Sequence, residues 1–319
     1  MLRATKPEAK EKRLKMFVYG PAGVGKTVAA LQFPNAYIID TEKGTDFYSG
    51  IINRSHSAVS QTLNPDDIKD ELKSLLTEKH NYKTLIIDPV TQVYNAIQEK
   101  WTRIFEANAK SEKEAQIGDF GMRYWGKVKG EFKAIQRILL QLDMNVIVTS
   151  HQKDVYGGGF SKIGVTFDSM KGDDYFFDLV FRLVKEGEKR NALTEKERAE
   201  PGLQKFPLEF EWSYENFCKF YGREILEKDA APVLMATEEQ VERIKQLVTT
   251  VRLDEETINK WFTKADVNNW DEMTTDQISN CIDFVEKKIK GVSVAGQALD
   301  EKNNGKEVNK NRVKKEVTK

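Results

Sequence analysis

The sequence predicts an α/β fold, in which helices flank a mainly parallel central sheet, followed by a small helical module. Short apolar runs recur between helical stretches, as is typical of buried parallel strands. The first run leads into a glycine-rich loop that opens a helix. A helical apolar pattern that begins near Thr237 predicts the additional module.

The glycine-rich loop matches the P-loop pattern G-x-x-x-x-G-K-[ST] in full. An apolar strand over residues 16–19 precedes it, and a short helix over 28–33 follows and ends at Pro34. Glycines let backbone N–H groups point at phosphate oxygens, and the helix starts with its positive end there. Lys26 is expected to reach the β- and γ-phosphates, and Thr27 to place its hydroxyl on Mg²⁺. The expected nucleotide contacts are Gly20, Pro21, Ala22, Gly23, Val24, Gly25, Lys26, Thr27 and Val28.

Acidic residues follow the next two predicted strands. The strand over 36–40 leads to Glu42, which would emerge beside the P-loop and could polarise the water that attacks the γ-phosphate. Alternatively, Asp40 and Glu42 cap a turn. The strand over 84–88 ends at Asp88 in a Walker B pattern, which predicts an aspartate near the Mg²⁺ bound by Thr27.

Amphipathic helices are predicted over 64–80, 91–106 and 124–142, while residues 45–64 look polar and irregular. A buried strand over 145–152 ends at His151 and Gln152, either of which could sense the γ-phosphate. Lysines and aromatic residues alternate over 153–174. This segment is either a flexible loop for single-stranded nucleic acid or a β-hairpin with inward aromatics.

A further strand over 178–184 and a turn lead to an extended segment that carries Lys196 and Arg198. Because alternate residues of a strand share a face, both could act as charge-neutralising fingers on a neighbouring subunit's nucleotide. The alternative is an exposed hairpin end with ordinary surface charges.

Composition limits the classes of protein that fit. The chain has 319 residues, of which 31% are charged, and no apolar stretch long enough to span a membrane. The N-terminus lacks the hydrophobic centre of a signal peptide, so a cytoplasmic location is expected. Cys218 and Cys281 form no metal-binding or disulfide pattern. The formal net charge is zero, so binding of nucleic acid by bulk charge alone is not expected. The two ends are nevertheless basic, since residues 1–15 carry +4 and residues 291–319 carry +3.

The motifs GPAGVGKT, IIDTE, LIID, VIVTSHQ, a glycine-rich loop and a KER strand occur in this order. Over roughly residues 14–226 the sequence resembles the RecA-like ATPase core, especially recombination and annealing ATPases encoded by bacteriophages. The resemblance implies ATP and Mg²⁺ as cofactors and assigns water activation to Glu42, the metal to Asp88 and γ-phosphate sensing to Gln152. It also implies that Lys196 and Arg198 reach across a subunit interface.

The same resemblance implies a homo-oligomer with nucleotide at subunit interfaces, and single-stranded DNA facing residues 108–122 and 153–172. The sequence departs from RecA in carrying His151 in place of Asn and in lacking RecA's N-terminal oligomerisation helix and strand. The implied function is a DNA-stimulated ATPase in phage-type recombination, repair or strand annealing, located in the bacterial host cytoplasm. A nucleotide switch or loader that regulates a protein partner is the alternative, and a P-loop kinase is a more distant one.

The expected organisation is a basic tail over 1–15, an ATPase core over 16–226, a linker over 227–236, a helical module over 237–290 and a disordered tail over 291–319. Two T-x-x-Q sequences, at Thr237 and Thr274, predict capping boxes at helix starts in the module. The module is either a docking site for DNA or for a single-strand-binding or recombination protein, or a stabilising appendage.

Overall fold

The computed structural model describes residues 12–108, 121–158, 161–199, 202–265 and 267–289. The chain divides into two compact units, Met1–Val233 and Leu234–Lys319. The tail predicted over 291–319 and most of the DNA-facing loop predicted over 108–122 lie outside the described residues.

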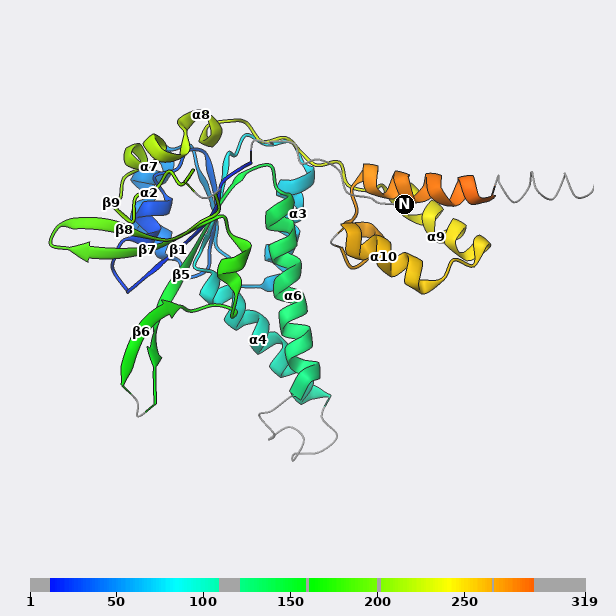
Figure 1. Cartoon of the computed structure of the whole chain (residues 1–319), viewed down its shortest axis with the longest axis horizontal. Helices are drawn as coiled ribbons and strands as arrows, with labels where there is room; N and C mark the ends of the chain where they lie inside the picture. Colours follow the sequence, from blue (N-terminus) through cyan, green and yellow to red (C-terminus); the bar gives the residue numbers. More distant parts are fainter. Residues whose placement is uncertain (1–11, 109–120, 159–160, 200–201, 266, 290–319) are drawn as a thin grey trace, which may run out of the picture. The chain divides into compact units, whose positions relative to one another are not determined.

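The first unit is built on a sheet with the strand order β3-β2-β4-β5-β1-β7-β8-β9, and β6 pairs with β5 beside this path (Figure 1). From β3 to β7 neighbouring strands run parallel, whereas β6, β8 and β9 join by antiparallel pairing. The predicted mainly parallel sheet is therefore confirmed. Its strands are β1 (Lys15–Gly20), β2 (Ala36–Asp40), β3 (Ala58–Ser60), β4 (Thr84–Asp88), β5 (Asn145–Tyr156), β6 (Lys162–Phe167), β7 (Leu179–Glu186), β8 (Lys189–Glu197) and β9 (Glu209–Glu211).

Helices cover both faces of the sheet, which explains why every residue of β1 and of β4 is buried. Helices α3, α4 and α6 lie on one face, and α2 and α7 lie on the other (Figure 1). On the second face the rings of Phe33 and Phe217 pack with their centroids 5.3 Å apart. The helices of this unit are α1 (Lys26–Ala30), α2 (Ser49–Arg54), α3 (Pro65–Thr77), α4 (Val90–Ala107), α6 (Gly121–Gln141), α7 (Tyr214–Tyr221) and α8 (Arg223–Leu226), with 3₁₀ turns η1 (Gly44–Tyr48) and η2 (Asp173–Phe176).

The structured chain begins before the predicted end of the basic tail. Arg13 is buried, and its Nε lies 2.9 Å from Asp143 Oδ1, while its Nη1 donates to the carbonyl oxygens of Ile225 and Lys228. Lys15 is buried in β1 and donates to the carbonyl oxygens of Leu142 and Met144. The prediction of a tail through residue 15 is wrong at its end, because charge counting cannot distinguish a solvated lysine from one bound to buried carbonyl groups.

The stretch predicted to be irregular over 45–64 is also more ordered than expected. It contains the end of η1, the two-turn helix α2 and the edge strand β3. These elements are too short to show a hydrophobic period. Ile52 of α2 is nevertheless buried in the core on the face of the sheet that α2 and α7 cover.

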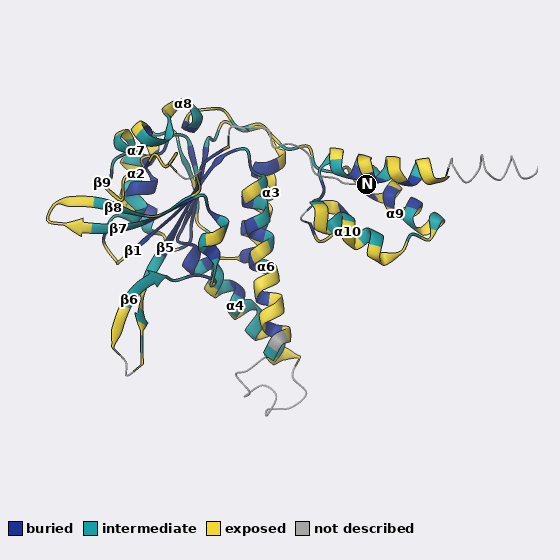
Figure 2. Cartoon of the chain, in the orientation of Figure 1, coloured by how far each residue is buried: buried dark blue, intermediate teal, exposed yellow. Residues whose placement is uncertain are grey.

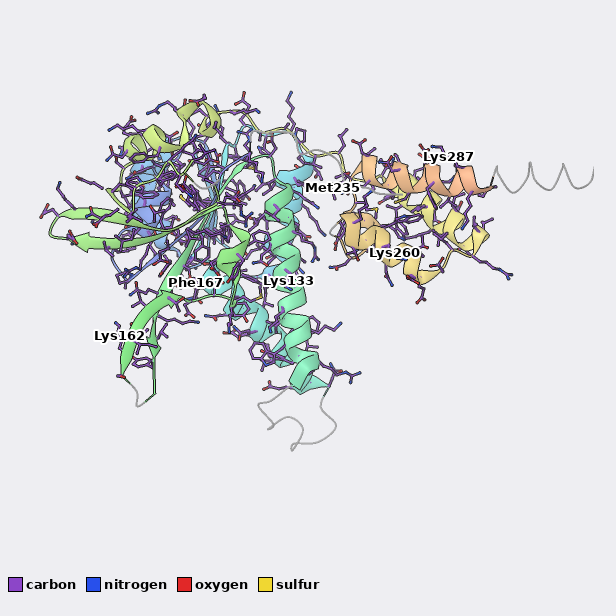
Figure 3. The ribbon with its side chains drawn as sticks, in the orientation of Figure 1. Lys133, Lys162, Phe167, Met235, Lys260 and Lys287 are labelled. Atoms are coloured by element: carbon purple, nitrogen blue, oxygen red, sulfur yellow. The ribbon has the colours of Figure 1, made fainter. Side chains whose placement is uncertain are left out.

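Strand β5 continues beyond the sheet to Tyr156, and β6 returns antiparallel to it, so that residues 152–158 and 161–167 form an arm. The arm projects from the carboxyl edge of the sheet, and its outer part is exposed (Figures 1 and 2). A hairpin is therefore confirmed where β5 and β6 pair, but the expected inward packing of its aromatics holds for Phe167 and not for Tyr156, which is exposed. Lys162 lies on the projecting part of the arm and Phe167 at its base (Figure 3).

The second unit contains helices α9 (Glu238–Val251) and α10 (Glu255–Ala265), the turn η3 (Trp270–Glu272) and a helix over residues 275–289. Its core includes Val241, Ile244, Ile278 and Val285. The capping box predicted at Thr237 is confirmed, with reciprocal bonds of 3.0 and 3.2 Å between Thr237 and Gln240. Among the described residues, none of the helices has both the length and the apolar character that a bilayer span requires.

Candidate active site

The P-loop connects β1 to α1 and uses its glycines in a conformation that other residues rarely adopt. Gly23 and Gly25 have φ angles of 71° and 98°. Val24, between them, is buried in the core and anchors the loop. The sequence folds this way because the two glycines turn the backbone around a space while the valine holds it to the sheet.

Lys26 folds back over this loop. Its Nζ donates to the carbonyl oxygens of Gly20 and Pro21, both at 3.0 Å. Burial lowers the pKa of Lys26, while the carboxylates of Asp88 and Glu42 act in the opposite direction. A partly desolvated ammonium group beside polar backbone groups is suited to binding a phosphate oxygen.

Asp88 stands at the carboxyl end of β4, in register with Asp40 on β2. Burial raises the pKa of Asp88, and hydrogen bonds from Thr149 and Thr27 oppose this rise. The structure thus brings the carboxylate of Asp88 and the hydroxyl of Thr27 together. This pair of hard oxygen donors fits Mg²⁺.

Asp40 and Glu42 have different roles, although only two residues separate them. The buried carboxylate of Asp40 accepts hydrogen bonds from the backbone N–H groups of Glu42, Gly44 and Thr45, so Asp40 caps the turn. Glu42 Oε1 instead accepts a 2.6 Å hydrogen bond from Gln92 Nε2, and His151 Nε2 lies 3.1 Å from the same oxygen. The turn leaves Glu42 directed toward the space in front of the P-loop.

These groups surround a cavity of about 510 Å³, a size suited to a small-molecule ligand. Gln152 and His151 reach it from β5, because Gly20 is in register with His151. Pro21 and Val24, which were expected to contact the nucleotide, do not line the cavity, and Val24 faces the core instead. The lining residues are Gly20, Ala22, Gly23, Gly25, Lys26, Thr27, Val28, Glu42, Tyr48, Asp88, Pro89, His151, Gln152 and Arg190.

Lys196 and Arg198 do not line this cavity. Lys196 Nζ donates to the carbonyl oxygen of Asp174 at 2.7 Å, and Arg198 Nη2 donates to that of Tyr175 at 2.8 Å. Arg198 also pairs with Asp178 at 2.9 Å. The two residues share a side, as their spacing predicts, but both are held by the η2 region of their own chain.

The sequence did not indicate Tyr48, Pro89 and Arg190 as lining residues. Tyr48 ends η1, within the stretch that carries no clear period. Arg190 follows the turn between β7 and β8, and its approach to the P-loop depends on the pairing of β7 with β1. No local spacing in the sequence could reveal this approach, although a basic residue after a tight turn at the carboxyl edge is a weak signal.

The arm combines exposed apolar side chains with ion-paired lysines. Tyr156 and Ile163 are 59% and 67% exposed. Lys153 lies 3.0 Å from Asp168, and Lys162 lies 2.7 Å from Asp154. Phe167 packs inward, 5.1 Å from the ring of Phe17. The aromatics therefore divide between the core and the solvent.

A family model described as an AAA domain matches residues 12–199, a region that contains all the lining residues of the cavity. The chain belongs to this AAA-domain family. The RecA-like P-loop ATPase fold predicted from the sequence is confirmed by this match and by the strand order, in which β5 separates the P-loop strand β1 from β4.

Comparison with solved structures finds a likeness to the crystal structure of the RadB recombinase. The sequence identity is 15%, the aligned region covers 58% of this chain and 81% of that one, and the TM-score is 0.35. No curated protein matches the chain.

Proposed function

We propose that this AAA-domain protein binds Mg-ATP in the P-loop cavity and hydrolyses it while acting on single-stranded DNA. The observation that carries the proposal is the convergence of Lys26, Thr27, Asp88, Glu42 and Gln152 on one cavity at the carboxyl edge of the sheet. This set supplies a phosphate cradle, two oxygen ligands for a cation and a carboxylate that can accept a proton.

Each residue has a distinct role in the proposed reaction. The P-loop N–H groups and Lys26 bind and orient the phosphates, and Glu42 accepts the proton of the attacking water. Gln92 and His151 hold the Glu42 carboxylate in position. Thr27 and Asp88 would hold Mg²⁺, which, when bound, neutralises charge on the phosphate oxygens. Gln152 senses whether the γ-phosphate is present.

The DNA part of the proposal is supported by the continuity of β5. One strand carries His151 and Gln152 at the cavity and then Lys153 and Tyr156 on the arm. The exposed ring of Tyr156 suits single-stranded DNA, because unpaired bases stack on aromatic rings. A shift of β5 on nucleotide binding would therefore move the arm.

In the wider proposal the protein works in recombination, repair or strand annealing of the phage type, in the host cytoplasm. It forms a homo-oligomer in which Lys196 and Arg198 complete a neighbouring subunit's site. The proposed division into core, linker and helical module assigns contact with DNA or with a single-strand-binding or recombination protein to the module. A nucleotide switch or loader with little turnover is the competing function.

The test is phosphate release from ATP with and without single-stranded DNA. We expect DNA to stimulate release, Lys26→Ala to abolish it without unfolding the chain, and Tyr156→Ala to weaken DNA binding about tenfold through the loss of base stacking. Leu208→Ala, which alters an exposed residue outside the arm, is the matched control. ATP binding without release would favour the switch, whereas release that ignores DNA would contradict the DNA part alone.

A further inference from the structure

Arg190 approaches the P-loop from the β7–β8 hairpin of the same chain. A Cβ atom added to Gly25 would lie 2.7 Å from Arg190 Nε and 3.1 Å from its Cδ. Arg190 also lines the cavity that Lys26 and Thr27 line. The side chain of Arg190 therefore crosses directly over Gly25, the glycine that precedes the P-loop lysine.

The backbone of Arg190 is fixed from two sides. In the β7–β8 ladder it pairs with Lys185, and its carbonyl oxygen accepts a 2.7 Å hydrogen bond from Trp212 N at the end of β9. The hairpin itself is held close to the loop, because a Cβ on Gly20 would lie 2.7 Å from the carbonyl oxygen of Leu183 on β7. The side chain is thus presented to the cavity by sheet strands rather than by a free loop.

Two other basic residues of β8 and its end are paired with carboxylates of the same chain. Lys189 lies 2.9 Å from Glu211, and Arg198 lies 2.9 Å from Asp178. Within the described residues Arg190 has no carboxylate partner, and its Nη1 donates to the carbonyl oxygen of Glu188 at 3.3 Å. Two cations, Lys26 and Arg190, therefore face one cavity, and their mutual repulsion is relieved when a polyanion lies between or beside them.

We infer that Arg190 is a phosphate-binding residue that acts on the nucleotide of its own chain. The inference rests on the proposed function, which supplies a nucleotide for the cavity, and adds a charged donor that the P-loop pattern does not contain. Guanidinium N–H groups match phosphate oxygens geometrically and keep their charge at any physiological pH. A single chain would then bind the phosphate chain between P-loop and hairpin, without a neighbouring subunit.

The test measures the affinity of fluorescent ADP and ATP at protein concentrations where light scattering shows a monomer. Arg190→Gln is expected to weaken binding of both nucleotides about 10-fold to 100-fold, as the loss of a charged hydrogen bond predicts. Arg190→Lys should recover part of the affinity. Lys189→Gln, which removes the adjacent charge that is paired with Glu211, should bind like wild type.

The result separates this inference from the proposed function. If the folded wild-type chain binds nucleotide and Arg190→Gln binds it equally well, Arg190 is a solvated surface charge and the inference is overturned. If the folded wild-type chain binds no nucleotide, the proposed function fails together with this inference. Equal losses in Arg190→Gln and Lys189→Gln would show a general effect of charge and would also overturn the assignment.

Discussion

Glu42 is held at the cavity by neutral and ionisable partners at once. Gln92 Nε2 donates to Oε1 at 2.6 Å, and His151 Nε2 lies 3.1 Å from Oε1 and 3.3 Å from Oε2. The side chain of Glu42 is 38% exposed, so water can reach it. A carboxylate that is fixed in direction and still accessible to water is what the proposed general base requires.

We predict that Glu42→Gln retains ATP binding but slows hydrolysis by about 10²–10⁴, because the amide keeps the shape of the side chain and cannot accept a proton. Binding is measured by titration and hydrolysis by phosphate release under saturating ATP. Asp46→Asn provides the control, since this exposed carboxylate on η1 does not line the cavity. Wild-type hydrolysis in Glu42→Gln would mean that another carboxylate is the base.

At the scale of elements, a buried carboxyl group lies near the base of the arm. Asp173 of η2 accepts hydrogen bonds from Gln136 Nε2 of α6 at 2.5 Å and from Ser169 Oγ at 2.6 Å. Burial raises the pKa of Asp173 to about 6. The native state therefore binds this proton more tightly than the unfolded chain, whose aspartates titrate near 4. Stability is then lost as the pH rises from about 4 to 6.

Asp173→Asn should remove this loss. Because the variant has no charge to bury, we expect its free energy of unfolding to rise relative to that of wild type between pH 4 and 6, by on the order of 2 kcal/mol. Above pH 7 the difference between the two free energies should stay constant. Urea unfolding at a series of pH values measures the difference. Asp70→Asn, on the exposed side of α3, should show no such gain. A difference that does not change with pH would refute the role given to burial.

The sequence predicts the parallel strands well, because both faces of these strands are apolar. Strands β4 and β5, with residues such as Ile86 and Val148, therefore stand out as continuous apolar runs. The P-loop and Asp88 could be recognised because their spacing is local. The approach of Arg190 to Gly25 could not be, since it depends on how a hairpin far along the chain pairs with β1. The different roles of Asp40, which caps the turn, and Glu42, which faces the cavity, likewise depend on hydrogen bonds that form only after folding.

For the whole molecule, the described cavity of one chain leaves Lys196 and Arg198 unused. Both donate to carbonyl oxygens of the η2 region and neither lines the cavity. Their charges would complete a nucleotide site only if a second copy of the chain presented its own cavity to this surface. Arg190 would then bind phosphate within its own chain, whereas Lys196 and Arg198 would stabilise the transition state at the site of the neighbouring chain.

This division predicts that the double change Lys196→Ala, Arg198→Ala lowers ATPase activity without weakening nucleotide binding to the isolated monomer. The deciding experiment mixes the double variant with Lys26→Ala protein at varied ratios while light scattering confirms oligomers. A mixed oligomer contains some sites whose P-loop comes from one chain and whose basic pair comes from the other, so activity should reappear and peak at an intermediate ratio. If the mixture stays inactive at every ratio although mixed oligomers form, the pair acts within its own chain or has no part in hydrolysis, and the proposed interface is wrong.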